Sequence, residues 1–74
     1  MSPTKQNTPT PYGRAVKRLR LGKKLTRAQL ADKSGVSRET IMEIEIGRTR
    51  SPGEDVLIKI ARGLEVDVRE LFGS

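Results

Sequence analysis

Apolar positions along this chain recur every three or four residues, the spacing that places side chains on one face of an α-helix. Two such stripes, one near each end of the chain, consist of Tyr12, Ala15, Val16 and Leu19, and of Leu57, Ile60, Ala61 and Leu64. No segment alternates apolar and polar residues over the length of a β-strand. The pattern therefore predicts an all-α fold.

Signals for helix starts divide this pattern into five short helices. Each start has a side chain that can accept a hydrogen bond from the first turn. These N-cap candidates are Thr10 before Pro11, Thr26 with Gln29, Ser37, Ser51 with Glu54, and Asp67 with Glu70. Glycines suited to chain reversal separate the helices, namely Gly22, Gly35, Gly47 and Gly63. We expect a compact five-helix domain over residues 12–74.

The first eleven residues differ from the rest of the chain. All 18 Val, Ile, Leu and Phe residues lie after Pro11. A segment without such side chains cannot bury enough apolar surface to offset the entropy of ordering it. Residues 1–11 are therefore predicted to form a disordered N-terminal tail.

The most informative pattern lies between Arg27 and Ile46. Two predicted helices, residues 26–34 and 37–46, are separated by a turn of a few residues at Gly35. A turn this short makes the helices cross steeply, and the small side chain of Ala31 allows the second helix to approach the first. This combination is typical of a helix-turn-helix.

With these residues in place, the chain resembles the lambda-repressor-like domains of the Cro/repressor (Xre) helix-turn-helix family over residues 12–73. The residues that carry the resemblance are Leu19-Arg20, Leu25-Thr26, Leu30-Ala31, Ser34-Gly35-Val36-Ser37, Ile41, Ile44-Glu45, Gly47, Pro52, Leu57, Ile60-Ala61, Leu64, Val66 and Leu71-Phe72.

The resemblance implies that the helix at about residues 37–46 enters the major groove of double-stranded DNA. The side chains that it places near base edges are Ser37, Arg38, Glu39, Thr40, Met42 and Glu43. Arg38 is the candidate for two hydrogen bonds to guanine. Glu39 and Glu43 have a second interpretation, as ordinary surface charges of a helix.

Phosphate contacts are expected on either side of that helix. Arg27 stands where many relatives carry glutamine, and an arginine at a helix start favours a phosphate over a base. The full set of candidates is Arg27, Lys23, Lys24, Arg48, Thr49 and Arg50.

Two further roles follow from the resemblance alone. Arg20 and Glu45 match a pair that forms a structural salt bridge in the family. The C-terminal end, with Ile58, Leu71 and Phe72, matches the surface through which relatives form dimers. The alternative for these apolar residues is that they are ordinary exposed or half-buried side chains.

Composition narrows the functional classes. Residues 1–27 hold eight Lys or Arg and no acid, whereas residues 28–74 hold seven bases and nine acids, which favours a polyanionic partner, nucleic acid or an anionic membrane surface. The chain has no His and no Cys, so we expect no enzyme activity, no metal site and no cofactor. No apolar run approaches the ~20 residues of a membrane span, so we expect a cytoplasmic protein. A membrane surface is not expected as a partner either, because the apolar stripe of the basic first helix is needed for the core.

We therefore expect sequence-specific binding to double-stranded DNA by a small transcriptional regulator, a weak homodimer on a palindromic operator. Because so short a chain leaves no room for a ligand domain, repression by promoter occlusion is the simplest mechanism. A phage-type repressor, a restriction–modification controller and an antitoxin all fit. The alternative is a protein-interaction adaptor or antitoxin-type module with weak or no DNA binding. Glu39 and Glu43 favour this alternative, and the basic first third of the chain opposes it.

Overall fold

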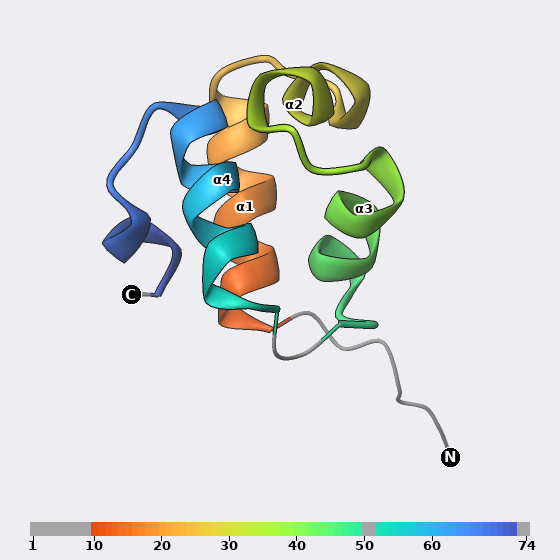
Figure 1. Cartoon of the computed structure of the whole chain (residues 1–74), viewed down its shortest axis with the longest axis vertical. Coiled ribbons are helices and arrows are strands. Elements are labelled where there is room, and N and C mark those ends of the chain that lie inside the picture. Colours follow the sequence, from red (N-terminus) through yellow and green to blue (C-terminus); the bar gives the residue numbers. More distant parts are fainter. Residues whose placement is uncertain (1–9, 50–51, 73–74) are drawn as a thin grey trace.

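The computed structural model describes residues 10–49 and 52–72, which form four α-helices and one 3-10 helix (Figure 1). The elements are α1 (Pro11–Gly22), α2 (Arg27–Ser34), α3 (Arg38–Ile46), α4 (Glu54–Leu64) and η1 (Val68–Leu71). No strand occurs within these two ranges. The all-α prediction is confirmed, and α2 and α3 form the predicted helix-turn-helix pair.

Four of the five predicted N-caps form, and three of them set the starts of α1, α2 and α3. The Thr10 hydroxyl accepts from the N–H of Gly13 at 3.1 Å, and that of Ser37 from the N–H of Thr40 at 3.1 Å. Thr26 and Gln29 form both hydrogen bonds of a capping box. Since Thr10 is buried and α1 begins at Pro11, the helical domain starts two residues before the predicted boundary. Residues 1–9 of the predicted tail lie outside the described part of the chain.

The predicted capping box at Ser51 is wrong. Helix α4 begins at Glu54, and its N-cap is Gly53, which has no side chain to accept a hydrogen bond. Ser51 itself lies outside the described residues. Glu54 and Asp55 occupy the first turn, where carboxylates interact favourably with the positive end of the helix dipole. Glu54 therefore acts through its charge at the helix start.

The fifth predicted helix is a single 3-10 turn. Asp67 caps it, and its carboxylate accepts from the backbone N–H of Arg69 at 2.9 Å. The backbone N–H groups of Glu70 and Phe72 donate to carbonyls three residues back, the bonding of a 3-10 helix. The tighter turn suits a segment of only four residues that ends with Leu71 fully buried.

One core joins all five elements. Its fully buried side chains are Val16, Leu30, Ile41, Ile44, Ile60, Leu64 and Leu71. Helix α2 packs on α4, while α3 packs on α1 and α2. In Figure 1, α3 lies to one side of the α1–α4 pair, which leaves its outer face open.

The glycines play two different structural roles. Gly35 (φ +76°) and Gly47 (φ +88°) end α2 and α3 in the left-handed region, as predicted. The same prediction is wrong for Gly22 and Gly63, which lie within the last turns of α1 and α4. Gly63 instead allows a close approach between helices, because a Cβ atom there would lie 2.8 Å from the Cβ of Ser34.

Two charged residues take the left-handed positions that were predicted for glycine. Lys24 (φ +59°) follows α1, and Glu65 (φ +61°) follows α4. In each turn the next residue donates its N–H five residues back, Leu25 to Arg20 and Val66 to Ala61. Both turns are thus Schellman motifs with a non-glycine residue in the strained position.

Candidate nucleic-acid interface

The N-terminal half of α3 presents a polar outer surface. Ser37, Arg38 and Glu39 are exposed, and Thr40, Met42 and Glu43 are half-buried. The Ser37 hydroxyl donates to that of Thr40 at 2.8 Å, so these two side chains are paired at the helix start. A hollow of about 410 Å³ lined by Arg27, Arg38, Glu39 and Met42 brings three of the six predicted base-contact residues next to α2.

Glu45, near the end of α3, forms ion pairs with two arginines. Its side chain is fully buried, and its carboxylate accepts from Nε and Nη2 of Arg20 at 2.7 and 3.1 Å. Arg20 also donates from Nη1 to the carbonyl of Leu25 at 2.8 Å. The two side chains that the family resemblance paired are therefore together in a buried ion pair that joins α1 to α3 and to the loop before α2.

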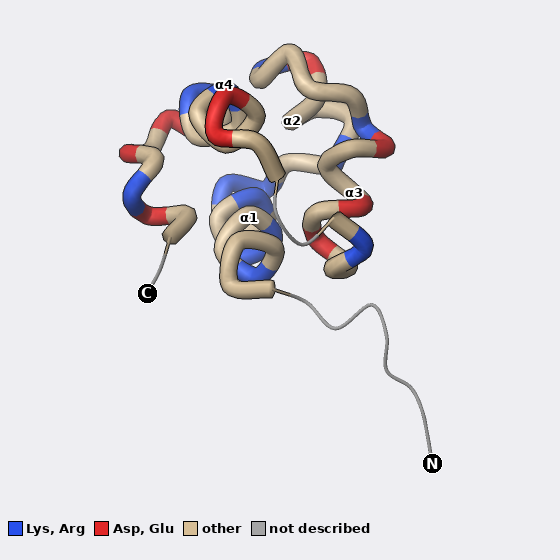
Figure 2. The backbone as a smooth tube through the Cα atoms, turned by 60° about the horizontal axis from the view of Figure 1, so that its bottom comes forward, with Lys and Arg blue, Asp and Glu red and all other residues tan. Residues whose placement is uncertain are grey.

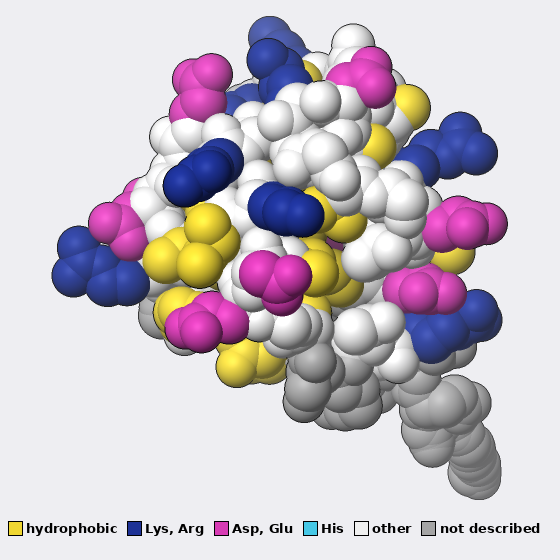
Figure 3. All heavy atoms as spheres, in the orientation of Figure 1, with side chains coloured by type: hydrophobic (Ala, Val, Ile, Leu, Met, Phe, Trp, Pro, Cys, Tyr) yellow, Lys and Arg dark blue, Asp and Glu magenta, His cyan; other side chains and the backbone are white. Residues whose placement is uncertain are grey.

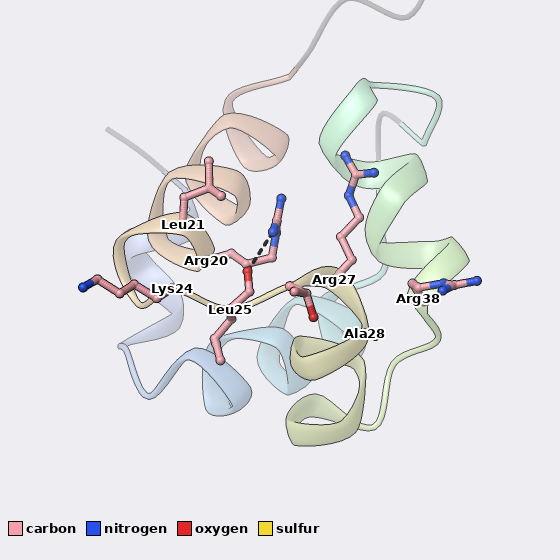
Figure 4. A pocket seen from close by; sticks show the side chains of 8 residues that line it. Arg20, Leu21, Lys24, Leu25, Arg27, Ala28 and Arg38 are labelled. Carbon is pink, nitrogen blue, oxygen red and sulfur yellow. Dashed lines mark hydrogen bonds between the residues drawn. The ribbon is translucent and has the colours of Figure 1, made fainter.

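Arg27 adds a second ion pair to the same carboxylate, which the sequence did not indicate. Its Nε donates to Oε1 of Glu45 at 3.0 Å, and its side chain is 34% exposed. Figure 4 shows Arg20 and Arg27 with their guanidinium groups on the same side, while Lys24 and Arg38 extend outward at opposite ends. One buried carboxylate thus orients two arginines, and within the described residues the Nη groups of Arg27 donate to no protein group.

No local signal in the sequence could have revealed the contact between Arg27 and Glu45. The two residues are 18 positions apart and lie on different helices. The only indication was the arginine at the start of α2, which predicted charge at that point but not its partner.

The predicted phosphate candidates lie at both ends of α3. Lys24 lines a second hollow, of about 490 Å³, that also contains Leu21, Arg27 and Arg38. Lys23 is exposed in the turn after α1 and lines a different hollow, of about 440 Å³, together with Lys33, Gly63 and Glu65. At the other end of α3, the N–H groups of Arg48 and Thr49 donate to the carbonyl of Glu43 at 2.9 and 3.1 Å. Arg50 lies outside the described residues.

The three predicted dimer residues are not equivalent. Leu71 is completely buried in the core of its own chain, so its prediction as an interface residue is wrong. Phe72 is 49% exposed and Ile58 38% exposed. The Phe72 ring packs edge-on against Tyr12 with centroids 5.7 Å apart. Figure 3 shows the face that includes α4, where hydrophobic side chains lie in small groups between charged ones of both signs.

Within residues 10–49 and 52–72, no helix is long and apolar enough to cross a bilayer. The same part of the chain contains no cluster of three or more His, Cys, Asp or Glu side chains placed to hold a metal ion.

Comparison with known proteins adds to this geometry. Residues 16–71 match the model of the helix-turn-helix family. The chain is 37% identical over 65 residues to the uncharacterized HTH-type transcriptional regulator RghRB of Bacillus subtilis (strain 168), which covers 88% of this chain. This chain spans about half of the length of that relative, 47%.

Two solved structures of similar shape are restriction–modification controller proteins. C.AhdI from Aeromonas hydrophila superposes with a TM-score of 0.79 at 31% identity, covering 84% of this chain and 92% of that one. A point mutant of the controller protein C.Esp1396I superposes with a TM-score of 0.76 at 32% identity, covering 84% of this chain and 79% of that one.

Proposed function

This chain belongs to the helix-turn-helix family, and from that membership we propose that it binds double-stranded DNA sequence-specifically as a small transcriptional regulator. In this proposal α3 enters the major groove and acts without a catalytic step. The protein works in the cytoplasm, where it represses transcription by covering a promoter.

The observation that carries the proposal is the surroundings of Arg38. Its side chain extends outward at the exposed start of α3. Arg27, the first residue of α2, is its neighbour, and the guanidinium of Arg27 is paired with the carboxylate of Glu45. An arginine in the major groove can donate two hydrogen bonds to guanine. An arginine fixed beside it at a helix start is suited to a phosphate.

The other residues of the site are proposed to contact bases, to contact phosphates or to stabilise the fold. Glu39, Thr40, Met42, Glu43 and Ser37 are proposed to lie near base edges, and a carboxylate there can accept from cytosine N4. Lys23, Lys24, Arg48, Thr49 and Arg50 are proposed to contact phosphates on the two sides of the groove. Arg20 is proposed to be structural only, since its guanidinium already donates to Glu45 and Leu25.

A weak homodimer on a palindromic operator completes the proposal. Its interface contains Ile58 and Phe72, the two large apolar side chains exposed near the C-terminal end. Two copies related by a two-fold axis would place their recognition helices about 34 Å apart, one turn of DNA.

Selection of bound sequences from a random pool of duplexes tests the proposal directly. We expect enrichment of a palindromic site whose half-sites are one turn apart and contain a guanine. The selection is repeated with Arg38→Gln, which should relax the preference at that guanine while other positions stay unchanged. Lys33→Gln, an exposed charge at the end of α2, is the control and should leave every position as it is. No enrichment with the unmodified protein would contradict the proposal.

One observation favours a second function, as a protein-interaction adaptor or antitoxin-type module. Glu39 and Glu43 place two negative charges on the outer side of α3, where they repel phosphates. A salt titration separates the two functions. DNA binding that depends on phosphate contacts loses affinity steeply between about 50 and 200 mM salt, whereas an adaptor shows no measurable DNA affinity at either concentration.

A further inference from the structure

The exposed face of α1 is the most basic surface that neither the core nor the helix-turn-helix uses. Arg14, Lys17 and Arg18, here called the basic strip, are all exposed on this helix. Leu21 continues the face one turn later and is 54% exposed. Figure 2 shows α1 with basic positions and no acidic one, whereas α3 carries both signs.

Within residues 10–49 and 52–72, the fold provides no ion-pair partner for these charges. Lys17 and Arg18 lie three and four positions after Arg14, so each of them is a neighbour of Arg14 on the helix surface and repels it. No acidic residue precedes Asp32 in the sequence. Among the described residues, none of the three takes part in an ion pair. The basic strip therefore opposes the stability of α1, and an external anion would relieve the repulsion.

The basic strip is continuous with the candidate DNA interface. It lines a hollow of about 340 Å³ together with Leu21 and Glu45. Leu21 also lines the hollow that contains Lys24, Arg27 and Arg38. Arg27 and Arg38 in turn line the hollow beside Glu39 and Met42. Three adjoining hollows thus connect α1 to the start of the recognition helix along one surface.

We propose that the basic strip binds phosphates of the same duplex, outside the segment that α3 reads. This rests on the proposed DNA-binding function and extends it to a helix that lies before the motif. Arg14 to Arg18 spans about 6 Å at the rise of an α-helix. One DNA strand presents about two phosphates over that axial length. The strip thus lengthens the footprint and adds affinity without sequence preference.

The test combines a variant with a change in duplex length. Arg14→Gln/Arg18→Gln removes two charges and keeps residues that favour helices. Affinity is measured against salt on two duplexes, one trimmed to the selected site and one extended by about 10 base pairs at each end. On the extended duplex we expect the variant to bind more weakly and its salt slope to be smaller by about 1.8, at about 0.9 for each phosphate contact. On the trimmed duplex the variant and the unmodified protein should bind alike.

The matched control is Lys59→Gln/Arg62→Gln. It removes the same charge from two exposed positions of α4, a helix that lines none of the three hollows. We expect it to leave the salt slope unchanged on both duplexes. An equal loss of affinity in this control would show a general effect of net charge and overturn the proposal. An equal loss on trimmed and extended duplexes by the Arg14/Arg18 variant would overturn it as well.

Two further outcomes keep this inference separate from the proposed function. If the unmodified protein selects a site and the Arg14/Arg18 variant binds like it on both duplexes, the strip is not a DNA contact although DNA binding stands. If no site is enriched at all, the proposed function itself fails. Binding of the unmodified protein to vesicles of phosphatidylserine, lost in the variant while the DNA salt slope is retained, would assign the strip to membranes and overturn the proposal.

Discussion

Two arginines near the candidate interface have opposite surroundings. Arg20 is buried and donates to Glu45 through two nitrogens, whereas Arg38 is exposed and has no ion pair among the described residues. The same residue type is therefore expected to serve stability at one position and recognition at the other.

Arg20→Ala should lower the free energy of unfolding much more than Arg38→Ala does. Removing one partner of a buried ion pair costs about 3–5 kcal/mol, and the remaining pair of Glu45 with Arg27 places this case at the lower end. Loss of an exposed side chain stays within about 0.5 kcal/mol. Urea unfolding of the two variants compares them, and a larger loss for Arg38→Ala would contradict the structural role of Arg20.

The strained turn residues offer a second comparison at the same scale. The left-handed backbone conformation destabilises the folded state by about 1–2 kcal/mol at a non-glycine residue. Glycine relieves this strain but loses more conformational entropy on folding, which offsets about 0.5–1 kcal/mol of the gain. Lys24→Gly and Glu65→Gly should therefore each stabilise the protein by about 0.5–1 kcal/mol in thermal unfolding.

The two glycine variants should differ in DNA binding. Lys24→Gly removes a proposed phosphate contact and should reduce the salt slope by about 0.9, while Glu65→Gly should leave it unchanged. Destabilisation by either substitution would show that the φ angle at that turn is not the source of strain.

At the scale of elements, the packing of α4 on α2 depends on one missing side chain. Gly63 faces Ser34, whereas a Cβ atom on Gly22 would meet no atom within 4 Å. The two glycines occupy similar places in the last turns of α4 and α1, so their environments alone distinguish them.

Gly63→Ala should destabilise the protein by about 1–3 kcal/mol, because the added methyl overpacks the contact between α4 and α2. Gly22→Ala should stabilise it by about 0.5–1 kcal/mol, because alanine loses less entropy in a helix. Denaturant unfolding of both variants measures the difference, and an equal sign for the two would contradict the described packing.

At the start of the short helix η1, Asp67 forms an exposed ion pair with Arg69. A side-chain hydrogen bond from Arg69, then the backbone N–H of the same residue, lower the pKa of the Asp67 carboxyl below its ordinary value. A carboxyl with a lowered pKa in the folded state contributes stability above its unfolded pKa and loses it as the pH falls through the folded pKa.

NMR titration should therefore show Asp67 ionising below the ordinary pKa of about 3.9. Arg69→Gln should raise that pKa while the backbone N–H of residue 69 keeps part of the shift. Because both side chains are exposed, the contribution to stability should be small and reduced by salt. A pKa for Asp67 that Arg69→Gln leaves unchanged would contradict this assignment.

At the scale of the whole molecule, the sequence predicted best where a local pattern determines the structure. The starts of α2 and α3 follow from Thr26 and Ser37, whose caps act within three residues. The role of Gly63 and the contact of Arg27 with Glu45 depend on which helices meet, and no local pattern contains that information. Leu71, predicted at a dimer surface, lies in the core for the same reason.

Assembly is the remaining question at this scale. Sedimentation at high micromolar concentration should show the unmodified protein approaching a dimer, because Ile58 and Phe72 expose apolar surface near one end of the chain. Ile58→Ser should stay monomeric, while Leu21→Ser, which changes an exposed leucine on α1, should behave like the unmodified protein. A monomer both with and without the selected duplex would contradict the proposed homodimer.

The buried carboxylate of Glu45 has one more consequence, in the entropy of binding. Since Arg27 is held at 3.0 Å from it, that long side chain is ordered before DNA arrives. Immobilising such a side chain on association costs about 0.5–1.5 kcal/mol, and here folding has already met that cost. Calorimetry of a Glu45→Gln variant that remains folded should show a less favourable binding entropy, although residue 45 is not among the proposed DNA contacts.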